Sequence, residues 1–439
     1  MTTTNPATSA LSRRTFLGLS AAAAALPLAA CNVSGTGSGG GDGTGGAISF
    51  WDMPWGPPEY NETGKRLVEE YEPDGGLPGA RYQTIQWSNF YQTFSSAIAS
   101  DTGPAVSSGA GFQAFQFAEQ GAIAYADDLL DKLRQNGLDD FLPGTVESLQ
   151  TPDGLVAVPW HVDLRPLWYN SALLDQAGAE VPSDWDSLLE AGRTLKRHGL
   201  VGFEMGAGAG NTTGSHILVG LMINNGGGLF DEEGNPDCLI DRNIEAVEFV
   251  LQLVREGIVG RGAVNFTTDN NNERWASRTV AMGFSTPNLK IEASSVGDDL
   301  VVASPLTGPH GDHGAVMFVN NLMMYTNTPS QEASEAFLTY YLDAMAAYWE
   351  EGTLGVIPAR RSIAEDPSYS SSENRRRLVN EWQPIAKTYA ARGTQSFAGL
   401  AAVDGGQTLQ QFTQRVLQGD TKARDALAVL QQGLEEAVA

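Results

Sequence analysis

The stretch TPDGLVAVPWHVDLRPLWYN, residues 151–170, decides how the rest of the chain is interpreted. It opens with a turn signal at residues 152–154, where proline presets φ and glycine accepts a positive φ. Apolar and β-favouring residues follow, interrupted by Pro159 and Pro166. Because proline has no N–H to donate to a β-ladder, the pattern predicts an extended segment that is not a central strand.

Polar side chains occupy one face of this extended segment. Side chains alternate along an extended chain, so His161, Asp163 and Arg165 are expected to point the same way. Burying two charged groups and an imidazole among apolar residues is costly unless polar partners meet them. The segment is therefore interpreted as a crossover between two bodies, with its polar face turned toward a ligand in the gap.

The N-terminal residues carry an export signal rather than a folded element. Residues 12–17 (SRRTFL) match a twin-arginine signal, and residues 28–31 (LAAC) match a bacterial lipobox ending at Cys31. We expect a signal peptide over 1–30, then a lipidated Cys31 and a flexible Gly/Ser linker over 31–46. The predicted location is the outer face of the cytoplasmic membrane. The alternative is an ordinary cleaved signal followed by a chance cysteine.

The charge of the chain excludes several partners. Asp and Glu number 52 and Lys and Arg 27, which gives a net charge of -25 at pH 7. Nucleic-acid phosphates and anionic lipid head groups would be repelled by such a surface. We therefore expect no nucleic-acid partner, and membrane attachment through the lipid anchor alone.

Strand-like and helix-like patterns alternate along the remaining chain. Such alternation predicts α/β lobes whose sheets are covered by helices on both faces. Ser183 is expected to be the N-cap of one helix, with Asp186 completing a capping box. The expected strands span residues 47–51, 82–87, 201–205, 279–284 and 315–326. The expected helices span residues 61–71, 88–99, 183–199, 244–254, 330–351 and 421–437.

Several blocks in a fixed order carry a resemblance to a known family. They are residues 154–160, 167–170 with Leu174, Gly178 and 182–185, then 224–231, 314–326 with the helix that follows, 355–360, and 416–419 with 426–427. Together they resemble the family 1 extracellular solute-binding proteins of ABC importers, the group that contains maltose-binding protein. The resemblance implies an α/β, two-lobe periplasmic-binding-protein-like fold (type II), with crossovers near residues 157–162, 303–308 and 357–360. It implies lobe I over 47–156 plus 307–357, and lobe II over 157–306 plus 358–439.

The same resemblance implies a saccharide in the cleft between the lobes. A sugar presents hydroxyls to carboxylates, amides and Arg, and C–H faces to aromatic rings. Of Asn320 and Asn321, one is expected to face the cleft, because neighbours on a strand point to opposite sides. The family's aromatic groups are missing beside Gln113, after residue 284 and beside Gln407, which argues against maltodextrin. The candidate ligand-binding residues are Trp55, Gln113, Trp160, His161, Asp163, Arg165, Asn211, His216, Ser285, Asn288, Asn320, Asn321 and Gln407.

Motifs of enzymes are missing from the sequence. It has no Gly-x-Ser-x-Gly elbow, no His-Glu-x-x-His and no P-loop, and the glycine-rich run at 206–211 lacks the third glycine of a dinucleotide fingerprint. His310 and His313 are interpreted as part of a polar loop rather than a metal site. We expect no catalytic residue, cofactor or metal.

The predicted partners are a saccharide and the transmembrane subunits of an ABC permease, with the ATPase contacted only indirectly, and the protein is expected to be a monomer. Three alternatives remain open. One is a surface-anchored glycoside hydrolase or lyase, because so many acids leave room for a catalytic pair. The second is a binding protein for glycerol-phosphate esters, with Arg165 as the anion partner. The third is an adhesin or sensor without a small ligand.

Overall fold

A computed structural model describes residues 46–87 and 90–439. The described residues fall within one compact unit. The predicted signal peptide, Cys31 and nearly all of the linker lie outside the described residues. Among the residues that are described, no helix is both long and apolar enough to cross a bilayer.

The larger sheet of the described chain has seven strands in the order β11-β6-β10-β3-β1-β2, with β12 paired to β10. β1 pairs in parallel with β2 and β3, whereas β10 runs antiparallel to both β3 and β6. The strands are β1 (Ile48–Asp52), β2 (Ala80–Thr84), β3 (Val106–Gly109), β6 (Val158–Leu164), β10 (Ala315–Met324), β11 (Ile357–Pro358) and β12 (Ala386–Lys387).

The smaller sheet contains β7 (Leu167–Asn170), β8 (Met282–Phe284) and β9 (Leu300–Val302), with β7 in the middle. β4 (Gln150–Thr151) and β5 (Gly154–Leu155) form a separate hairpin. Residues 201–205, predicted as a strand, make only isolated bridges such as the one from Phe203 to Val259.

The expectation that residues 158–164 avoid the middle of a sheet is wrong. β6 lies between β10 and β11 and is paired on both sides. It tolerates Pro159 because the register between β6 and β10 shifts where Pro159 faces Asn321, so no regular ladder position needs a donor there. Pro166 falls between β6 and β7, outside both strands.

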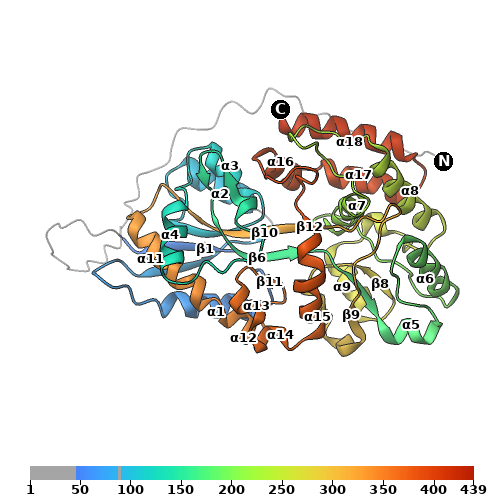
Figure 1. Cartoon of the computed structure of the whole chain (residues 1–439), viewed down its shortest axis with the longest axis horizontal. Helices are drawn as coiled ribbons and strands as arrows, with labels where there is room; N and C mark the ends of the chain where they lie inside the picture. Colours follow the sequence, from blue (N-terminus) through green and yellow to red (C-terminus); the bar gives the residue numbers. More distant parts are fainter. Residues whose placement is uncertain (1–45, 88–89) are drawn as a thin grey trace, which may run out of the picture. The chain divides into compact units, whose positions relative to one another are not determined.

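Helices of two groups cover the two sheets (Figure 1), and β6 and β10 run between the groups. We call the groups, with their sheets, the larger-sheet lobe and the smaller-sheet lobe. Helices of the larger-sheet lobe are α1 (Pro58–Glu69), α2 (Phe90–Ala99), α3 (Gln113–Glu119), α4 (Asp127–Gln135), α11 (Gln331–Ala344), α12 (Ala347–Glu350), α13 (Arg361–Glu365) and α14 (Pro367–Ser370). Helices of the smaller-sheet lobe are α5 (Ser171–Ala177), α6 (Trp185–Arg197), α7 (Thr213–Asn224), α8 (Asp241–Arg255), α9 (Thr268–Ala276), α10 (Leu289–Glu292), α15 (Glu373–Arg377), α16 (Gly399–Gly405), α17 (Thr408–Gln418) and α18 (Ala423–Val438).

The cap of α6 lies one residue later than predicted. Asp184, not Ser183, is the N-cap: its carboxylate accepts from the Ser187 N–H at 2.8 Å, and the Ser187 hydroxyl in turn accepts from the Asp184 N–H at 3.0 Å. The capping box therefore ends at Ser187 rather than Asp186. The sequence contains overlapping candidates, and the pattern alone does not separate them.

This geometry predicts unequal effects of two neighbouring substitutions. Asp184→Ala is expected to lower the free energy of unfolding by about 1 kcal/mol, because it removes the side-chain acceptor for the first turn of α6. Ser183→Ala is expected to change it by less than about 0.5 kcal/mol. Urea unfolding of the two variants measures the difference, and equal losses would contradict the assigned cap.

Candidate functional site

A cleft of about 850 Å³ lies where the two lobes face each other, beside β6 and β10. The larger-sheet lobe contributes the loop after β1, the start of α2 and the loop after β3. The smaller-sheet lobe contributes α7, α9, α10, α16 and α17. Part of the predicted set lines this cleft: Trp55, Asp163, Arg165, His216, Asn320 and Gln407.

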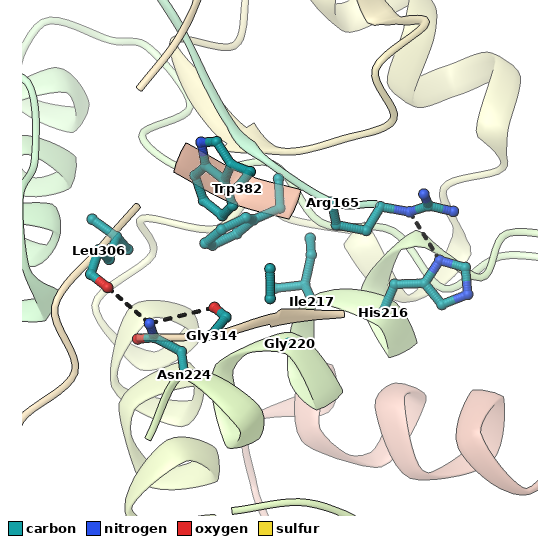
Figure 2. A pocket seen from close by; sticks show the side chains of 10 residues that line it. Arg165, His216, Ile217, Gly220, Asn224, Leu306, Gly314 and Trp382 are labelled. Atoms are coloured by element: carbon teal, nitrogen blue, oxygen red, sulfur yellow. Dashed lines mark hydrogen bonds between the residues drawn. The ribbon is translucent and has the colours of Figure 1, made fainter. Parts of the chain in front are cut away.

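Arg165 is held in place by three acceptors. Its Nη1 donates to the Asp163 carboxylate at 2.7 Å and to the Leu164 carbonyl at 3.1 Å, and its Nε donates to His216 Nδ1 at 3.0 Å. Figure 2 shows the Arg165–His216 bond. Because Nδ1 accepts, the proton of His216 belongs on Nε2. Burial, and secondly the charge of Arg165, hold the pKa of His216 well below its usual value, so the imidazole is neutral.

Carboxylates outnumber cations on the cleft wall. Asp163, Glu292 and Asp404 line it, whereas Arg165 is the single cation among the described lining residues. Burial raises the pKa of Asp404 to about 6 despite the opposing charge of Arg165. Desolvation by the surrounding protein also raises the pKa of Glu292, and the negative charge of Asp163 raises it further. Such a wall attracts hydroxyl donors and repels anions.

Aromatic rings form a row along the wall supplied by the larger-sheet lobe. The centroids of Trp55 and Trp87 are 4.8 Å apart, those of Trp87 and Phe90 are 5.1 Å apart, and those of Phe90 and Tyr91 are 4.2 Å apart. The Trp87 Nε1 donates to the Pro54 carbonyl at 2.9 Å, which fixes its ring. Ring faces of this kind cover the C–H patches of a sugar.

Two predicted aromatic residues lie behind this wall rather than in it. Trp160 and His161 are fully buried and do not line the cleft. Both rings meet the Trp55 ring nearly edge-on, at centroid distances of 5.7 and 4.8 Å. His161 Nδ1 lies 3.3 Å from the Asn320 side-chain nitrogen, so this histidine braces one residue that does line the cleft.

The predicted amides that do not line the cleft hold its loops. Gln113 Oε1 accepts from the Ala110 N–H at 3.4 Å, and Asn321 donates to the Gly111 carbonyl at 3.2 Å. Asn211 donates to the Phe266 carbonyl at 2.7 Å. The strand alternation thus places Asn320 on the cleft and Asn321 in the interior.

Ser285 and Asn288 also lie outside the lining. The Ser285 N–H donates to the Pro166 carbonyl at 3.2 Å, next to the crossover. The Asn288 side chain joins the lobes: it donates to the Trp55 carbonyl at 3.2 Å and accepts from the Gly355 N–H at 2.7 Å. Its contacts are with the backbone of Trp55 and of Gly355.

Sequence reasoning missed several lining residues. Trp87, Phe90 and Tyr91 follow helical spacing, which is typical of a core face, yet Trp87 is 37% exposed. Asp404 directly precedes the Gly405-Gly406-Gln407 segment, which the sequence had already indicated. This position next to the segment could have indicated that Asp404 lines the cleft. Tyr389 and Glu292 gave no such signal, because only the fold brings them to the cleft.

A second void, whose lining residues are drawn in Figure 2, lies beside the Arg165–His216 pair. Its volume is about 10 Å³, which is barely enough for one water molecule. Asn224 beside it donates to the Leu306 carbonyl at 2.8 Å. This void is therefore a packing gap and not a ligand site. Among the described residues, no group of His, Cys, Asp or Glu is placed to hold a metal ion.

Comparison with known proteins identifies the class. The family model described as bacterial extracellular solute-binding protein matches residues 57–348. A crystal structure of a sugar transporter from Arthrobacter chlorophenolicus A6 with bound laminaribiose is 54% identical, covers 89% of this chain and 99% of that one, and superposes with a TM-score of 0.83. The chain therefore belongs to the family of bacterial extracellular solute-binding proteins, which are binding proteins and not enzymes.

More distant relatives agree on the fold. Maltose-bound T. maritima MalE3 is 18% identical, with a TM-score of 0.72 over 89% of this chain and 100% of that one. The two-lobe α/β periplasmic-binding-protein fold expected from the sequence is thus confirmed. The arabinooligosaccharide-binding protein of Halalkalibacterium halodurans is 23% identical over 240 residues, which are 52% of this chain. The chain spans about half the length of that curated relative, 53%.

Proposed function

We propose that this protein is the saccharide-binding subunit of an ABC importer and that it takes a neutral di- or short oligosaccharide. The observation that carries the proposal is the cleft, where a row of aromatic rings faces carboxylates and amides. The relative with bound laminaribiose supports the same class of ligand. Laminaribiose, a disaccharide, is the first ligand to test.

The charges of the cleft favour a neutral ligand over glycerol-phosphate esters. Arg165 would be the anion partner, but its positive charge is already paired with the Asp163 carboxylate. Glu292 and Asp404 line the same cleft and would repel a phosphate. Neutral hydroxyls, in contrast, can donate to all of these carboxylates.

The proposed ligand contacts follow from the lining. Asp163 and Asp404 would accept from hydroxyls, Arg165, Asn320 and Gln407 would donate to them, and the rings of Trp55 and Trp87 would cover C–H faces. We assign the predicted residues behind the wall a supporting role, in which they hold the lining residues and the loops that carry them. They are Gln113, Trp160, His161, Asn211, Ser285, Asn288 and Asn321.

The transport cycle is proposed on the same basis. Lobe I over 47–156 plus 307–357 and lobe II over 157–306 plus 358–439 would close on the sugar, because contacts from both lobes exist only in the closed form. The closed form would then dock on the permease. Export through the twin-arginine signal and anchoring through lipidated Cys31 would keep the protein at the outer face of the cytoplasmic membrane.

A thermal-shift series tests the proposal. Laminaribiose at about 100 times its Kd should stabilise the protein by about 2.7 kcal/mol, which corresponds to a rise in Tm of about 3 °C for a folded chain of this length. The sugar should be recovered unchanged by chromatography. Glycerol 3-phosphate serves as the anionic control and should leave Tm unaltered. If no neutral saccharide from mono- to tetrasaccharide shifts Tm, the proposed function is wrong.

A further inference from the structure

A buried carboxylate lies directly behind the aromatic wall of the cleft. Asp52 is the last residue of β1, is fully buried, and does not line the cleft. Its Oδ1 accepts from the Ser108 hydroxyl at 2.6 Å and from the Trp55 indole N–H at 3.2 Å. Its Oδ2 accepts from the hydroxyls of Tyr60 and Tyr82 at 2.8 and 2.9 Å. All of these donors are neutral.

Such an arrangement is costly for the fold alone. Burial raises the pKa of Asp52 to about 6, and the hydrogen bonds of the surrounding donors only partly oppose this effect. A buried charge without a cation is generally less favourable than a neutral group of the same size. Packing alone therefore does not account for a carboxylate at this position. The side chain that its hydrogen bonds orient offers an explanation.

The group that Asp52 orients is the Trp55 indole. The indole N–H is shared between Asp52 Oδ1 and Ser108 Oγ, which lies 3.1 Å away, and the Ser108 hydroxyl itself points at Asp52. The Trp55 ring is part of the cleft wall, and it meets Trp87 edge-on at 90°. Rotating the indole would break both bonds and turn the ring face that a sugar would stack on.

We propose that Asp52 is a positioning residue that fixes the Trp55 ring for the saccharide, without touching the saccharide itself. This inference rests on the proposed function. According to this proposal, Asp52 affects the affinity for the saccharide only through its hydrogen bond to the Trp55 N–H. Tyr82 serves as an internal contrast, because it bonds the other carboxylate oxygen and Asn61 at 2.7 Å, away from Trp55.

A double-mutant cycle in the full chain tests the inference. Asp52→Asn is expected to weaken laminaribiose binding about fivefold, because an amide oxygen holds the Trp55 N–H less strongly than a carboxylate does. In the Trp55→Phe background, where the indole N–H is already gone, Asp52→Asn should change affinity by less than about 1.5-fold. Calorimetry measures all four Kd values. An equal loss in both backgrounds, or no loss in the wild-type background, would overturn the proposal.

Two further measurements separate positioning from general destabilisation. Tyr82→Phe should lower Tm but change affinity by less than about twofold. Ser108→Ala keeps the buried carboxylate and should weaken laminaribiose binding as Asp52→Asn does. It replaces Asp52→Asn as the test if Asp52→Asn fails to fold.

A spectroscopic readout does not depend on sugar binding. In protein labelled with 5-fluorotryptophan, the ¹⁹F resonance that Trp55→Phe removes should shift in Asp52→Asn without any ligand. An unshifted resonance would refute the positioning role even if sugar binding is intact. A shifted resonance in a protein that binds no saccharide would instead refute the proposed function and leave the Asp52–Trp55 coupling standing.

Discussion

Replacing Asp163 with alanine is expected to abolish measurable saccharide binding while the fold stays intact. The carboxylate lines the cleft, and its side chain is 20% exposed, so it remains open to ligand hydroxyls while it bonds Arg165. Bonds from hydroxyls to a charged acceptor contribute about 1.5–3 kcal/mol each, so two of them account for a loss of about 100-fold or more. Calorimetric titration with laminaribiose measures the affinity.

This variant should stay folded although it loses some stability. Without Asp163, Arg165 keeps its bonds to the Leu164 carbonyl and to His216, and it still lines the cleft. Because the guanidinium that loses its partner is buried, we expect the free energy of unfolding to fall by about 1–3 kcal/mol, which leaves the fold intact. Asp131→Ala is the matched control, because Asp131 pairs with Arg134 at 3.0 Å on the exposed surface of α4. If the affinity of Asp163→Ala for laminaribiose stays within about threefold of wild type, Asp163 does not contact the saccharide and only stabilises the crossover.

The sequence predicted which side chains of the crossover share a polar face, but it did not predict the position of β6 inside the sheet. The polar face with Asp163 and Arg165 was visible from alternation, because the period of an extended chain does not depend on its neighbours. The interior position of β6 was missed, because Pro159 excludes a regular ladder but not a ladder with a shifted register. Whether the partner strand bulges there is a property of β10, and the residues around Pro159 do not encode it.

The sequence predicted a cleft residue only where the same segment gave both the direction of the side chain and its polar character. Asp163 and Asn320 lie on strands that carry their own periodicity, so their direction followed from local rules. Trp87 and Tyr91 follow the helical period of a core face, and only the fold brings them to the cleft. Asp52 gave no signal at all, because its bonds to Ser108 and Tyr82 join residues far apart in the sequence.

Asp404 is expected to make saccharide binding sensitive to mild acid. No described residue donates a hydrogen bond to its carboxylate, which lines the cleft and has its pKa raised to about 6 by burial. The ionised form accepts from a ligand hydroxyl, and protonation removes that acceptor as the pH falls through the pKa. Affinity should therefore fall about tenfold between pH 7 and pH 5. Asp404→Asn should bind more weakly than wild type at pH 7 and lose most of this dependence.

Other titratable groups in the cleft wall and behind it limit how flat the profile of the variant can be. The pKa values of His161 and His216 are held well below the usual value, first by burial, so both stay neutral across this range. The pKa values of Asp52 and Glu292 are raised, so a residual decline of up to about threefold is expected in Asp404→Asn. Asp420→Asn removes an exposed carboxylate outside the lining and should reproduce the wild-type profile. A full tenfold decline in Asp404→Asn would assign the titration to another group and remove Asp404 from the proposed contacts.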